Sequence, residues 1–238
     1  RRLRYAKILA QKREREGFNL EVARDKMFER NYFGMMMVGT GDADAFITGL
    51  YTRYAGTIQA AKEVIGIRPG YEHFGALHLV SSKKGICFFG DTLINRDPDE
   101  HALYDLARLA ASGVRFFNRT PAMAMISYSN FGSDEDGKPA VVHRVVERMQ
   151  KEYPELAIDG EMQVNFALDR ELRDEKYPFT RLKGQDVNTL IFQSLSAANA
   201  AYKIAKSMAD EGEVIGPIQI GLNKAIHFTD FETDVRDI

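Results

Sequence analysis

Several features are scarce in this sequence of 238 residues, and each scarcity excludes a class of protein. The single cysteine, Cys87, cannot form a disulfide within the chain, so we expect a reducing compartment, most simply the cytoplasm. Lys and Arg number 32 against 34 Asp and Glu, so the basic excess of a nucleic-acid-binding protein is missing. The longest apolar stretches, such as residues 33–38, have the length of a strand rather than of a membrane span, and no signal peptide is recognisable. We therefore expect neither a nucleic acid nor a membrane as a partner.

The residues that are present are typical of a globular protein. Apolar residues make up 45% of the chain and charged residues 28%. A chain of this length can bury roughly 70–75% of its unfolded surface, which is enough for a sizeable core in one or two domains. Because the sequence begins with Arg1 instead of Met and stops at Ile238 without a capped end, we expect it to be part of a longer protein.

Helices and strands are expected to alternate along most of the chain. Residues 2–30 predict two helices that break at Gly17, the second with an inward face of Val22, Ala23, Met27 and Phe28. Residues 33–38 fit either a buried strand or the core of a helix. Further helices are expected at 54–65, 98–112 (capped by Asp97 or Asp99), 140–152 and 197–210. Strands are expected at 76–80, 85–89, 122–127, 158–160, 187–192 and 214–220, which predicts an α/β fold with a mainly parallel sheet.

Isolated chemical signals in the sequence are weak. Gly39-Thr40-Gly41 resembles the start of a phosphate-binding loop, but the third glycine is missing and Asp42 would repel a phosphate, so a tight turn is favoured. The five histidines lack metal-ligand spacing, and with one cysteine no metal site is expected. Cys87 lies in an apolar strand, which favours a buried small hydrophobic residue over a nucleophile.

Three segments expected at the carboxyl ends of strands are more informative, namely residues 127–133, 159–163 and 216–222. Ligands of α/β proteins bind at that edge of the sheet. The small hydroxyl residues and glycines of these segments suit an anionic or extended ligand, although ordinary turn chemistry explains them equally well.

Taken in order, these segments resemble phosphate acetyltransferases. The resemblance rests on Ile126-Ser127-Tyr128-Ser129, Asp159-Gly160-Glu161-Met162-Gln163, residues 198–203 (ANAAYK) and residues 215–222 (IGPIQIGL). A tighter similarity, to the C-terminal acetyltransferase-like domain of bacterial multidomain NADP-dependent malic enzymes, rests on residues 30–34 (RNYFG), 129–133 (SNFGS) and 177–184 (YPFTRLKG).

The resemblance implies a fold and an assembly. It implies two α/β/α three-layer domains with an interdomain cleft, in the architecture of isocitrate and isopropylmalate dehydrogenases, with mainly parallel sheets. Residues 1–68 and 218–238 would form the first domain, and residues 69–217 the second. It also implies a homo-oligomer.

The activity of the family is transfer of an acetyl group between phosphate and coenzyme A (CoA). The family uses a Ser-Arg pair, a later Asp and an Arg in a Thr-x-Arg-Pro segment. This sequence has Asp230 and Phe231 at the Ser-Arg pair, keeps the Asp as Asp237, and has Gln59 in place of the second Arg. Each lost guanidinium removes charge-assisted hydrogen bonds worth about 1.5–3 kcal/mol. We therefore expect acyl transfer to be lost or very slow, and Asp237 to be catalytic only if activity survives.

The resemblance also supplies a set of residues for binding a CoA ester. They are Thr57, Gln59, Ser127, Tyr128, Ser129, Asn130, Gln163, Asn199, Gly216, Pro217, Gly221, Asp230 and Phe231.

Three functions stay open on the sequence. The first is an acetyl-CoA-responsive regulatory and oligomerisation domain of an NADP-dependent malic enzyme, which converts malate to pyruvate and CO2. NADP and a divalent metal (Mg or Mn) would then belong to a malic-enzyme domain elsewhere in the same parent chain. The second is an active phosphate acyltransferase with another acyl substrate, and the third is a purely structural assembly module.

Overall fold

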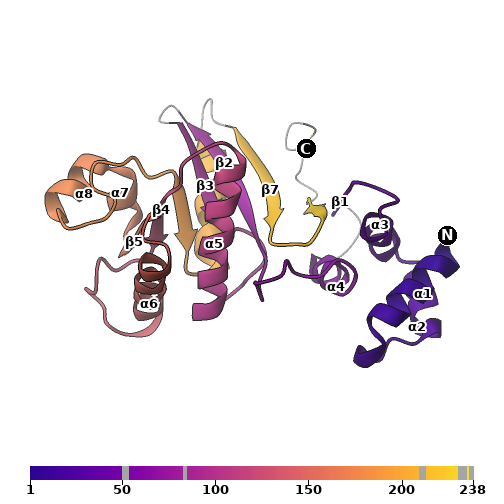
Figure 1. The fold of residues 1–238 in the computed structure, drawn as a ribbon. Helices are drawn as coiled ribbons and strands as arrows, with labels where there is room; N and C mark the ends of the chain where they lie inside the picture. The colour runs from indigo at the N-terminus through magenta and orange to yellow at the C-terminus, as the bar shows by residue number, and fades with distance from the viewer. Residues whose placement is uncertain (50–53, 83–84, 209–212, 230–234, 236–238) are drawn as a thin grey trace. The chain divides into compact units, whose positions relative to one another are not determined.

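The computed structural model describes residues 1–49, 54–82, 85–208, 213–229 and 235. The chain divides into two compact units (Figure 1). One unit is formed by Arg1–Tyr71 together with Gly221–Val235, and the other by Glu72–Ile220. No helix among the described residues is long and apolar enough to cross a membrane.

The first unit is mainly helical, with one pair of short strands. Its helices are α1 (Arg2–Lys12), a 3-10 turn (Glu14–Glu16), α2 (Leu20–Lys26), α3 (Arg30–Gly39) and α4 (Tyr54–Val64). Strand β1 (Ala45–Thr48) pairs in parallel with β8 (Ala225–Phe228), which joins the two ends of the chain in one unit. Gly17 ends the first helical segment in a left-handed conformation, with a φ of 85°, as the sequence predicts. Of the two readings of residues 33–38, the helix is confirmed.

The predicted inward face of the second helix is partly wrong. Ala23 and Met27 are buried as expected, but Val22 is exposed and Phe28 is 71% exposed. The helix ends at Lys26, four residues earlier than predicted, so Phe28 lies in the turn that follows it. There the Phe28 ring lies 4.9 Å from the guanidinium of Arg2 instead of in the core.

The second unit is built on a six-stranded sheet in the order β5-β4-β6-β3-β2-β7. Its strands are β2 (Gly75–Ser82), β3 (Gly85–Gly90), β4 (Ala122–Ile126), β5 (Ala157–Met162), β6 (Thr189–Phe192) and β7 (Val214–Ile220). Strands β5, β4, β6 and β3 are parallel neighbours, whereas β2 is antiparallel to both β3 and β7. The predicted α/β fold with a mostly parallel sheet is confirmed.

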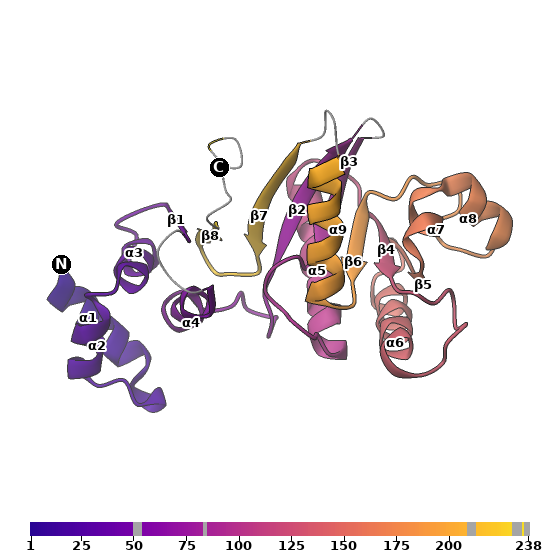
Figure 2. The same ribbon diagram turned by 180° about the vertical axis from the view of Figure 1, so that it is seen from behind.

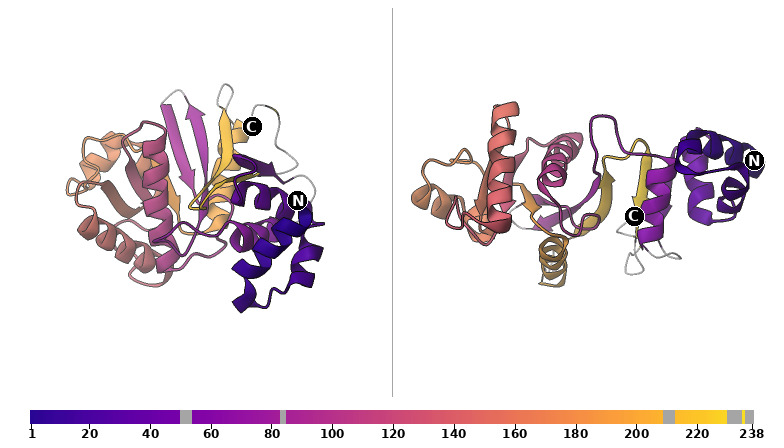
Figure 3. Two further views of the ribbon diagram at one scale, coloured as in Figure 1. Left: turned by 45° about the vertical axis from the view of Figure 1, so that its right-hand side comes forward. Right: turned by 90° about the horizontal axis from the view of Figure 1, so that it is seen from below.

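Helices cover both faces of this sheet. Helices α5 (Glu100–Phe116) and α6 (Gly137–Glu152) lie on one face, and α9 (Leu195–Met208) lies on the other (Figures 1, 2 and 3). Side chains alternate across each strand, so Met123 and Met125 join the core under α5 and α6 while Ala124 and Ile126 join the core under α9. The unit therefore has two apolar cores, one on each face of its sheet.

Most elements that the sequence predicts in the second unit are present. The hairpin of β2 and β3 and the helix capped by Asp99, whose carboxylate accepts from the Ala102 amide at 2.8 Å, are confirmed. Two short helices, α7 (Val164–Leu168) and α8 (Arg170–Lys176), were not predicted. The domain split after residues 68 and 217 stays a prediction, as does the dehydrogenase-like architecture, and residues 218–220 continue strand β7.

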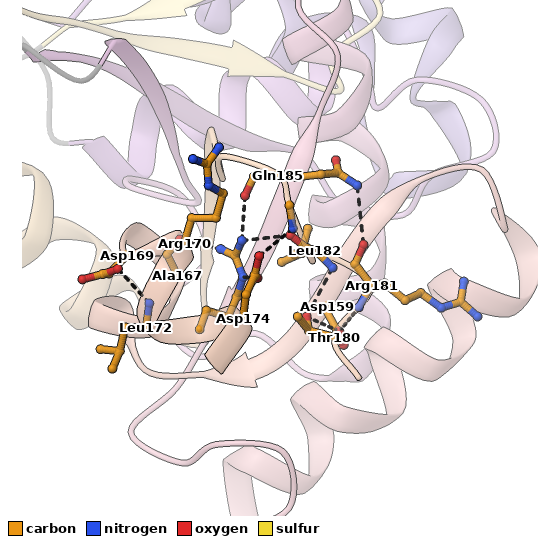
Figure 4. A network of polar contacts seen from close by, with 12 residues as sticks. Asp159, Ala167, Asp169, Arg170, Leu172, Asp174, Thr180, Arg181, Leu182 and Gln185 are labelled. Atoms are coloured by element: carbon orange, nitrogen blue, oxygen red, sulfur yellow. Dashed lines mark hydrogen bonds and ion pairs between the residues drawn. The ribbon is translucent and has the colours of Figure 1, made fainter. Parts of the chain in front are cut away.

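The segment after α8 has no regular structure, and two polar groups hold it in place (Figure 4). The side chain of Arg173 is fully buried, and its guanidinium donates to the carbonyl oxygens of Ala167 (3.2 Å), Leu182 (2.8 Å) and Gln185 (2.6 Å). Asp159, on strand β5, accepts from the Thr180 hydroxyl at 2.7 Å and from a backbone amide of the same segment. These contacts fix residues 177–187 against the sheet without a strand or helix of their own.

The Arg173 contacts predict a large effect on stability. Replacing Arg173 by Met keeps the volume but removes the donor to three backbone carbonyl oxygens, of which that of Leu182 keeps the Gln185 amide as a partner at 3.0 Å. The free energy of unfolding should fall by about 3 kcal/mol, because a buried network loses its central group. Urea denaturation measures this value. Arg170→Met, at an exposed position of the same helix, is the matched control and should change stability by less than about 0.5 kcal/mol. Equal effects of the two variants would contradict the anchoring role of Arg173.

Candidate functional site

The carboxyl ends of β3, β4, β5 and β6 meet at one edge of the second unit's sheet, because these four strands are parallel. Two hydrogen bonds connect the segments that leave this edge. The amide of Ser127, after β4, donates to the carbonyl of Met162 at 2.9 Å, and the amide of Leu195, after β6, donates to the carbonyl of Arg96 at 3.1 Å. The edge is therefore a connected surface of loops, as expected for a ligand site in an α/β protein.

Glu161 is the buried centre of this edge. Its side chain is completely inaccessible, and Oε1 accepts from the Ser129 hydroxyl at 3.0 Å and from the Gly132 amide at 2.6 Å. Its backbone carbonyl accepts from the Phe131 amide at 2.8 Å. The second carboxylate oxygen, Oε2, has no hydrogen-bond partner and lies 3.5 Å from Nδ1 of the half-exposed His143. Glu161 thus fixes three successive parts of the loop that follows β4.

Five of the predicted binding residues gather in that loop and beside it. The Gln163 amide donates to Asn130 Oδ1 at 2.8 Å, and its side chain donates to the Tyr128 carbonyl at 2.7 Å. The Ser127 hydroxyl accepts from the Ser129 amide at 3.3 Å. We call these five residues the loop cluster. Its backbone is held by its own side chains, while the ring of Tyr128 is 62% exposed.

An aromatic group adjoins the loop cluster. Phe131 adopts a left-handed conformation with a φ of 47°, which is unusual for a bulky side chain. Its ring centroid lies 4.7 Å from Tyr177 and 5.1 Å from Phe179, and the Phe179 ring is 68% exposed. The unusual backbone of Phe131 is thus held by Glu161 and presents a ring to the segment after α8.

A second buried carboxylate lies at the end of β3. Asp91 accepts from the Ala76 amide (2.9 Å) and from both the backbone amide (2.7 Å) and the side chain (2.6 Å) of Asn95. Burial raises the pKa of Asp91 above its usual range, although these hydrogen bonds oppose the shift. Nearby, His78 contacts Thr92 at 2.7 Å and stacks on Tyr202, so it is a satisfied core histidine, one of the two roles that the sequence predicts.

Other predicted residues lie away from the loop cluster. Asn199 lies on α9. Gly216 and Pro217 lie inside strand β7, which confirms the strand predicted over 214–220. The segment 216–222 therefore begins within the strand and not after its carboxyl end, where it was expected. A Cβ on Gly216 would lie 2.9 Å from the carbonyl oxygen of Leu77, so this glycine allows close strand packing. Gly221 has a φ of 94° and belongs to the first unit.

The two predicted residues of α4 make contacts within the first unit. Thr57 is buried and accepts from the Asn31 side chain at 3.0 Å, and Asn31 in turn accepts from Thr48 at 2.7 Å. Gln59 is exposed, and its side-chain amide donates to Glu63 one turn later. Asp230, Phe231 and Asp237 lie outside the described residues.

The weaker sequence signals have structural explanations. Gly39 ends helix α3, and Thr40 and Gly41 form a turn after it, with Gly41 at a φ of 80°. The predicted tight turn is confirmed, and Asp42 beyond it accepts from the Tyr5 hydroxyl at 2.5 Å. Burial raises the pKa of Cys87 to about 12, which agrees with a non-nucleophilic thiol. Within the described ranges, no group of three or more His, Cys, Asp or Glu side chains is placed to hold a metal ion.

Comparison with known proteins shows the family of this chain. The sequence matches the phosphate acetyl/butaryl transferase family over residues 1–238. The chain belongs to this family. A phosphate acetyltransferase of Nitratidesulfovibrio vulgaris is 36% identical over 95% of the chain and 32% of that protein. The NADP-dependent malic enzyme of Salmonella typhimurium is 33% identical over 94% of the chain and 30% of that enzyme.

Solved structures of the family have the same fold. A phosphotransacetylase from Streptococcus pyogenes matches with a TM-score of 0.89 at 31% identity, over 98% of this chain and 71% of that chain. A phosphotransacetylase from Staphylococcus aureus matches with a TM-score of 0.85 at 28% identity, over 98% and 71%. The chain therefore spans about a third of the length of the first curated relatives and most of the length of these family structures.

Our sequence reasoning missed the contacts of Glu161, His143 and Asp91 at this edge. Glu161 belongs to the segment Asp159–Gln163, which the sequence analysis expected at a ligand site. Within that segment, a carboxylate before Met162 is typical of a strand end and did not indicate a buried role. The only available signal was its position one residue before the edge of a buried parallel strand, where an unpaired charge is costly. His143 carried no signal, because its contact with Glu161 is made only in the folded chain. Asp91 accepts mainly from the residues that follow it, a pattern that is typical of an ordinary turn.

Removing the Glu161 carboxylate should release the loop cluster. Glu161→Ala removes the acceptor of the Gly132 amide and of the Ser129 hydroxyl, which keeps its contact with the Ser133 hydroxyl at 2.9 Å, and empties a fully buried position. We expect the free energy of unfolding to fall by about 1–3 kcal/mol. We also expect amide exchange at Gly132 to accelerate by more than about tenfold, as local opening becomes easier. Glu147→Ala is the control, because Glu147 is exposed and contacts the same His143 at 3.6 Å. If the amide-exchange rate at Gly132 were unchanged in Glu161→Ala, the loop would keep its conformation without the Glu161 carboxylate, and the prediction would be contradicted.

The raised pKa of Cys87 predicts slow alkylation. With a pKa of about 12, the thiolate is scarce at pH 8, so iodoacetamide should react more than about 100-fold more slowly than with free cysteine, whose pKa is about 8.5. The rate should rise with pH well beyond pH 9 instead of levelling off. Mass spectrometry of the intact chain follows the reaction. A rate like that of free cysteine would contradict the burial of this thiol.

Proposed function

We propose that this chain is a phosphate-acetyltransferase-like domain that binds a CoA ester without transferring its acyl group. The observation that carries this proposal lies in the sequence. The resemblance implies two arginines at the phosphate, and this chain has neither of them. The sequence has Gln59 at one of these positions and Phe231 at the other, with Asp230 beside it. Phosphate and a developing oxyanion need fixed positive charge in the site, and a neutral amide, an aromatic ring and a carboxylate do not supply it.

The surroundings of Gln59 strengthen this reading. Its side-chain amide is already engaged by Glu63, and Glu63 also accepts from the Tyr32 hydroxyl. Burial, together with the carboxylate of Glu63, raises the pKa of Tyr32 well above its usual range, so this hydroxyl stays neutral. The Gln59 side chain itself is therefore a neutral amide bound to a carboxylate, and it supplies no positive charge to a phosphate.

The loop cluster supports retained ligand binding. Ser127, Ser129 and Asn130 form a pre-organised loop at the edge of the sheet where α/β proteins bind ligands. The buried serines hold the loop, which presents the exposed Tyr128 and the partly exposed Asn130 to a ligand. Binding there has little entropic cost, because the backbone is already ordered. Acyl transfer needs cations that this chain has lost, whereas binding at this edge does not depend on them.

We assign the ligand as acetyl-CoA and its effect as regulation of a malic-enzyme-type protein. The similarity to an NADP-dependent malic enzyme over 94% of the chain supports this parent. NADP, a divalent metal and the conversion of malate would belong to the remainder of such a parent, and acetyl-CoA lies downstream of its product. A coupling of 1–3 kcal/mol between the two sites would be typical, in a homo-oligomer that this domain helps to form.

An active acyltransferase is the second candidate. One observation favours it: the phosphate acetyltransferase of Nitratidesulfovibrio vulgaris is 36% identical, against 33% for the malic enzyme. In that case Gln59, Asp230 and Phe231 would shape the site for another acyl group. A purely structural assembly module would bind no CoA ester at all.

Two measurements on one preparation separate the three functions. Acetyl-CoA is titrated by calorimetry, since the chain has no Trp for a fluorescence signal, and acetyl and butyryl phosphate are tested as acyl donors to CoA. The regulatory domain predicts micromolar binding and no thioester formation. Thioester formation would establish the acyltransferase, and no binding up to millimolar acetyl-CoA would leave the assembly module.

Restoring the family residues tests why transfer is lost. We expect the triple variant Gln59→Arg, Asp230→Ser, Phe231→Arg to form acetyl-CoA from acetyl phosphate at least about tenfold faster than the unsubstituted chain, since each guanidinium contact is worth about 1.5–3 kcal/mol. Gln11→Arg, which adds a cation at an exposed position of α1, is the control and should have no effect. A triple variant that stays inactive while binding acetyl-CoA would contradict the cationic explanation.

A further inference from the structure

One oxygen of the buried Glu161 carboxylate lacks a hydrogen-bond donor. The side chain is completely inaccessible, and its Oε1 accepts from the Ser129 hydroxyl and the Gly132 amide, whereas Oε2 has no hydrogen-bond partner. A buried carboxylate is tolerated when donors or a cation compensate for the lost contact with water. The loop cluster therefore depends on a carboxylate that one further donor, placed at Oε2, would stabilise.

The imidazole of His143 lies where it can supply this donor. His143 belongs to helix α6, and its side chain is 47% exposed. Nδ1 lies 3.5 Å from Oε2 of Glu161, and Nε2 lies 3.6 Å from Oε1 of Glu147, one turn later on the same helix. A charge-assisted hydrogen bond is about 2.7–2.9 Å long, so a shift of the half-exposed ring by less than about 1 Å completes the contact with Glu161.

The ring can serve both carboxylates only when it is protonated. A neutral imidazole has one N–H, so it donates either to Glu161 or to Glu147. An imidazolium has an N–H on each nitrogen and a positive charge, and histidine passes between the two forms in the range of pH 5–8. Uptake of one proton by His143 therefore supplies a charged donor to the buried Oε2, while Glu147 orients the other side of the ring.

The other charged groups on α6, on the elements packed against it and in the loop after β4 are paired or exposed. Those with a partner are Glu100, Asp105 and Arg108 on α5, Lys138, Arg144, Arg148 and Glu152 on α6, Asp159 on β5 and Asp134 in the loop. The exposed ones are His101 and Arg115 on α5, Lys151 on α6, and Glu135 and Asp136 in the loop. Among the residues that the structure describes, Glu147 and Glu161 are the ionisable groups in contact with the His143 ring.

We propose that His143 is a positioning residue that couples the loop cluster to proton uptake: the protonated ring donates to Oε2 of Glu161 and stabilises the ordered loop after β4. Glu161 holds that loop through Ser129 and Gly132, so whatever stabilises its carboxylate in place also stabilises the loop. The consequence for a ligand rests on the function proposed above. A CoA ester that binds the ordered loop should bind more tightly when His143 is protonated.

Amide exchange of Gly132 in the ligand-free chain tests this coupling, because the Gly132 amide donates to Oε1 of Glu161. The protection factor compares its exchange rate with that of an unstructured amide at the same pH, and so reports opening of the loop. We expect a protection factor about threefold higher at pH 6 than at pH 8, as for an ion pair of a half-exposed side chain.

Two histidine variants make the test specific. In His143→Gln, whose amide does not titrate, the protection factor of Gly132 should be the same at pH 6 and pH 8. His101→Gln is the matched control, because His101 is exposed on the neighbouring helix α5, and it should keep the threefold difference. A difference that persists in His143→Gln, or no difference in the unsubstituted chain, would overturn the proposal.

Calorimetry then connects the coupling to the ligand. The ratio of the Kd for acetyl-CoA at pH 8 to that at pH 6 should be about threefold larger in the unsubstituted chain than in His143→Gln, a comparison that cancels titration of the ligand itself. Equal ratios in the two chains would contradict the effect of His143 on binding. Absence of binding at both pH values would contradict the proposed function, whereas the exchange of Gly132 without ligand still decides whether His143 acts on the loop.

Discussion

The buried carboxylate of Glu161 is the constraint on which the candidate site depends. A charge without access to water is tolerated only when its surroundings supply donors, and here the donors come from the loop after β4. The same residue receives the Phe131 amide on its backbone carbonyl, so the chain after Ile126 must turn back over the end of β5. The position of the loop cluster, the left-handed Phe131 and the neighbouring aromatic group all follow from that one requirement.

In the second unit, the two faces of the sheet carry the apolar cores, and its carboxyl edge carries the polar loops. The core under α5 and α6 and the core under α9 hold the sheet, and buried Arg173 and Asp159 attach the segment after α8 to it. The carboxyl edge is then free to carry polar loops, because stability does not depend on their having regular structure. The α9 face is less completely filled, and the small side chains of Cys87 and Ala205 line a cavity of about 600 Å³ there.

The sequence predicted elements well where the pattern is local. The β2–β3 hairpin and the Asp99 cap follow from alternation and from a carboxylate at a helix start, and both are confirmed. Helix α2 ended early, and Phe28 was misplaced, because charged residues on both sides give no signal for where a helix stops. Gly216 was expected both in the strand 214–220 and in a segment at its carboxyl end; it lies in the strand, where it permits close packing against β2. Glu161 was missed because its role depends on partners in the loop after another strand, brought together only by the sheet.

The central claim is that the loop cluster of the second unit binds a CoA ester, and hydrogen exchange with and without saturating acetyl-CoA tests it most directly. Ligand contact should slow exchange in the peptides that cover residues 127–133 and Gln163, while the core strand β4 stays unchanged. Protection confined to other parts of the chain, at a ligand concentration where calorimetry shows binding, would contradict the account.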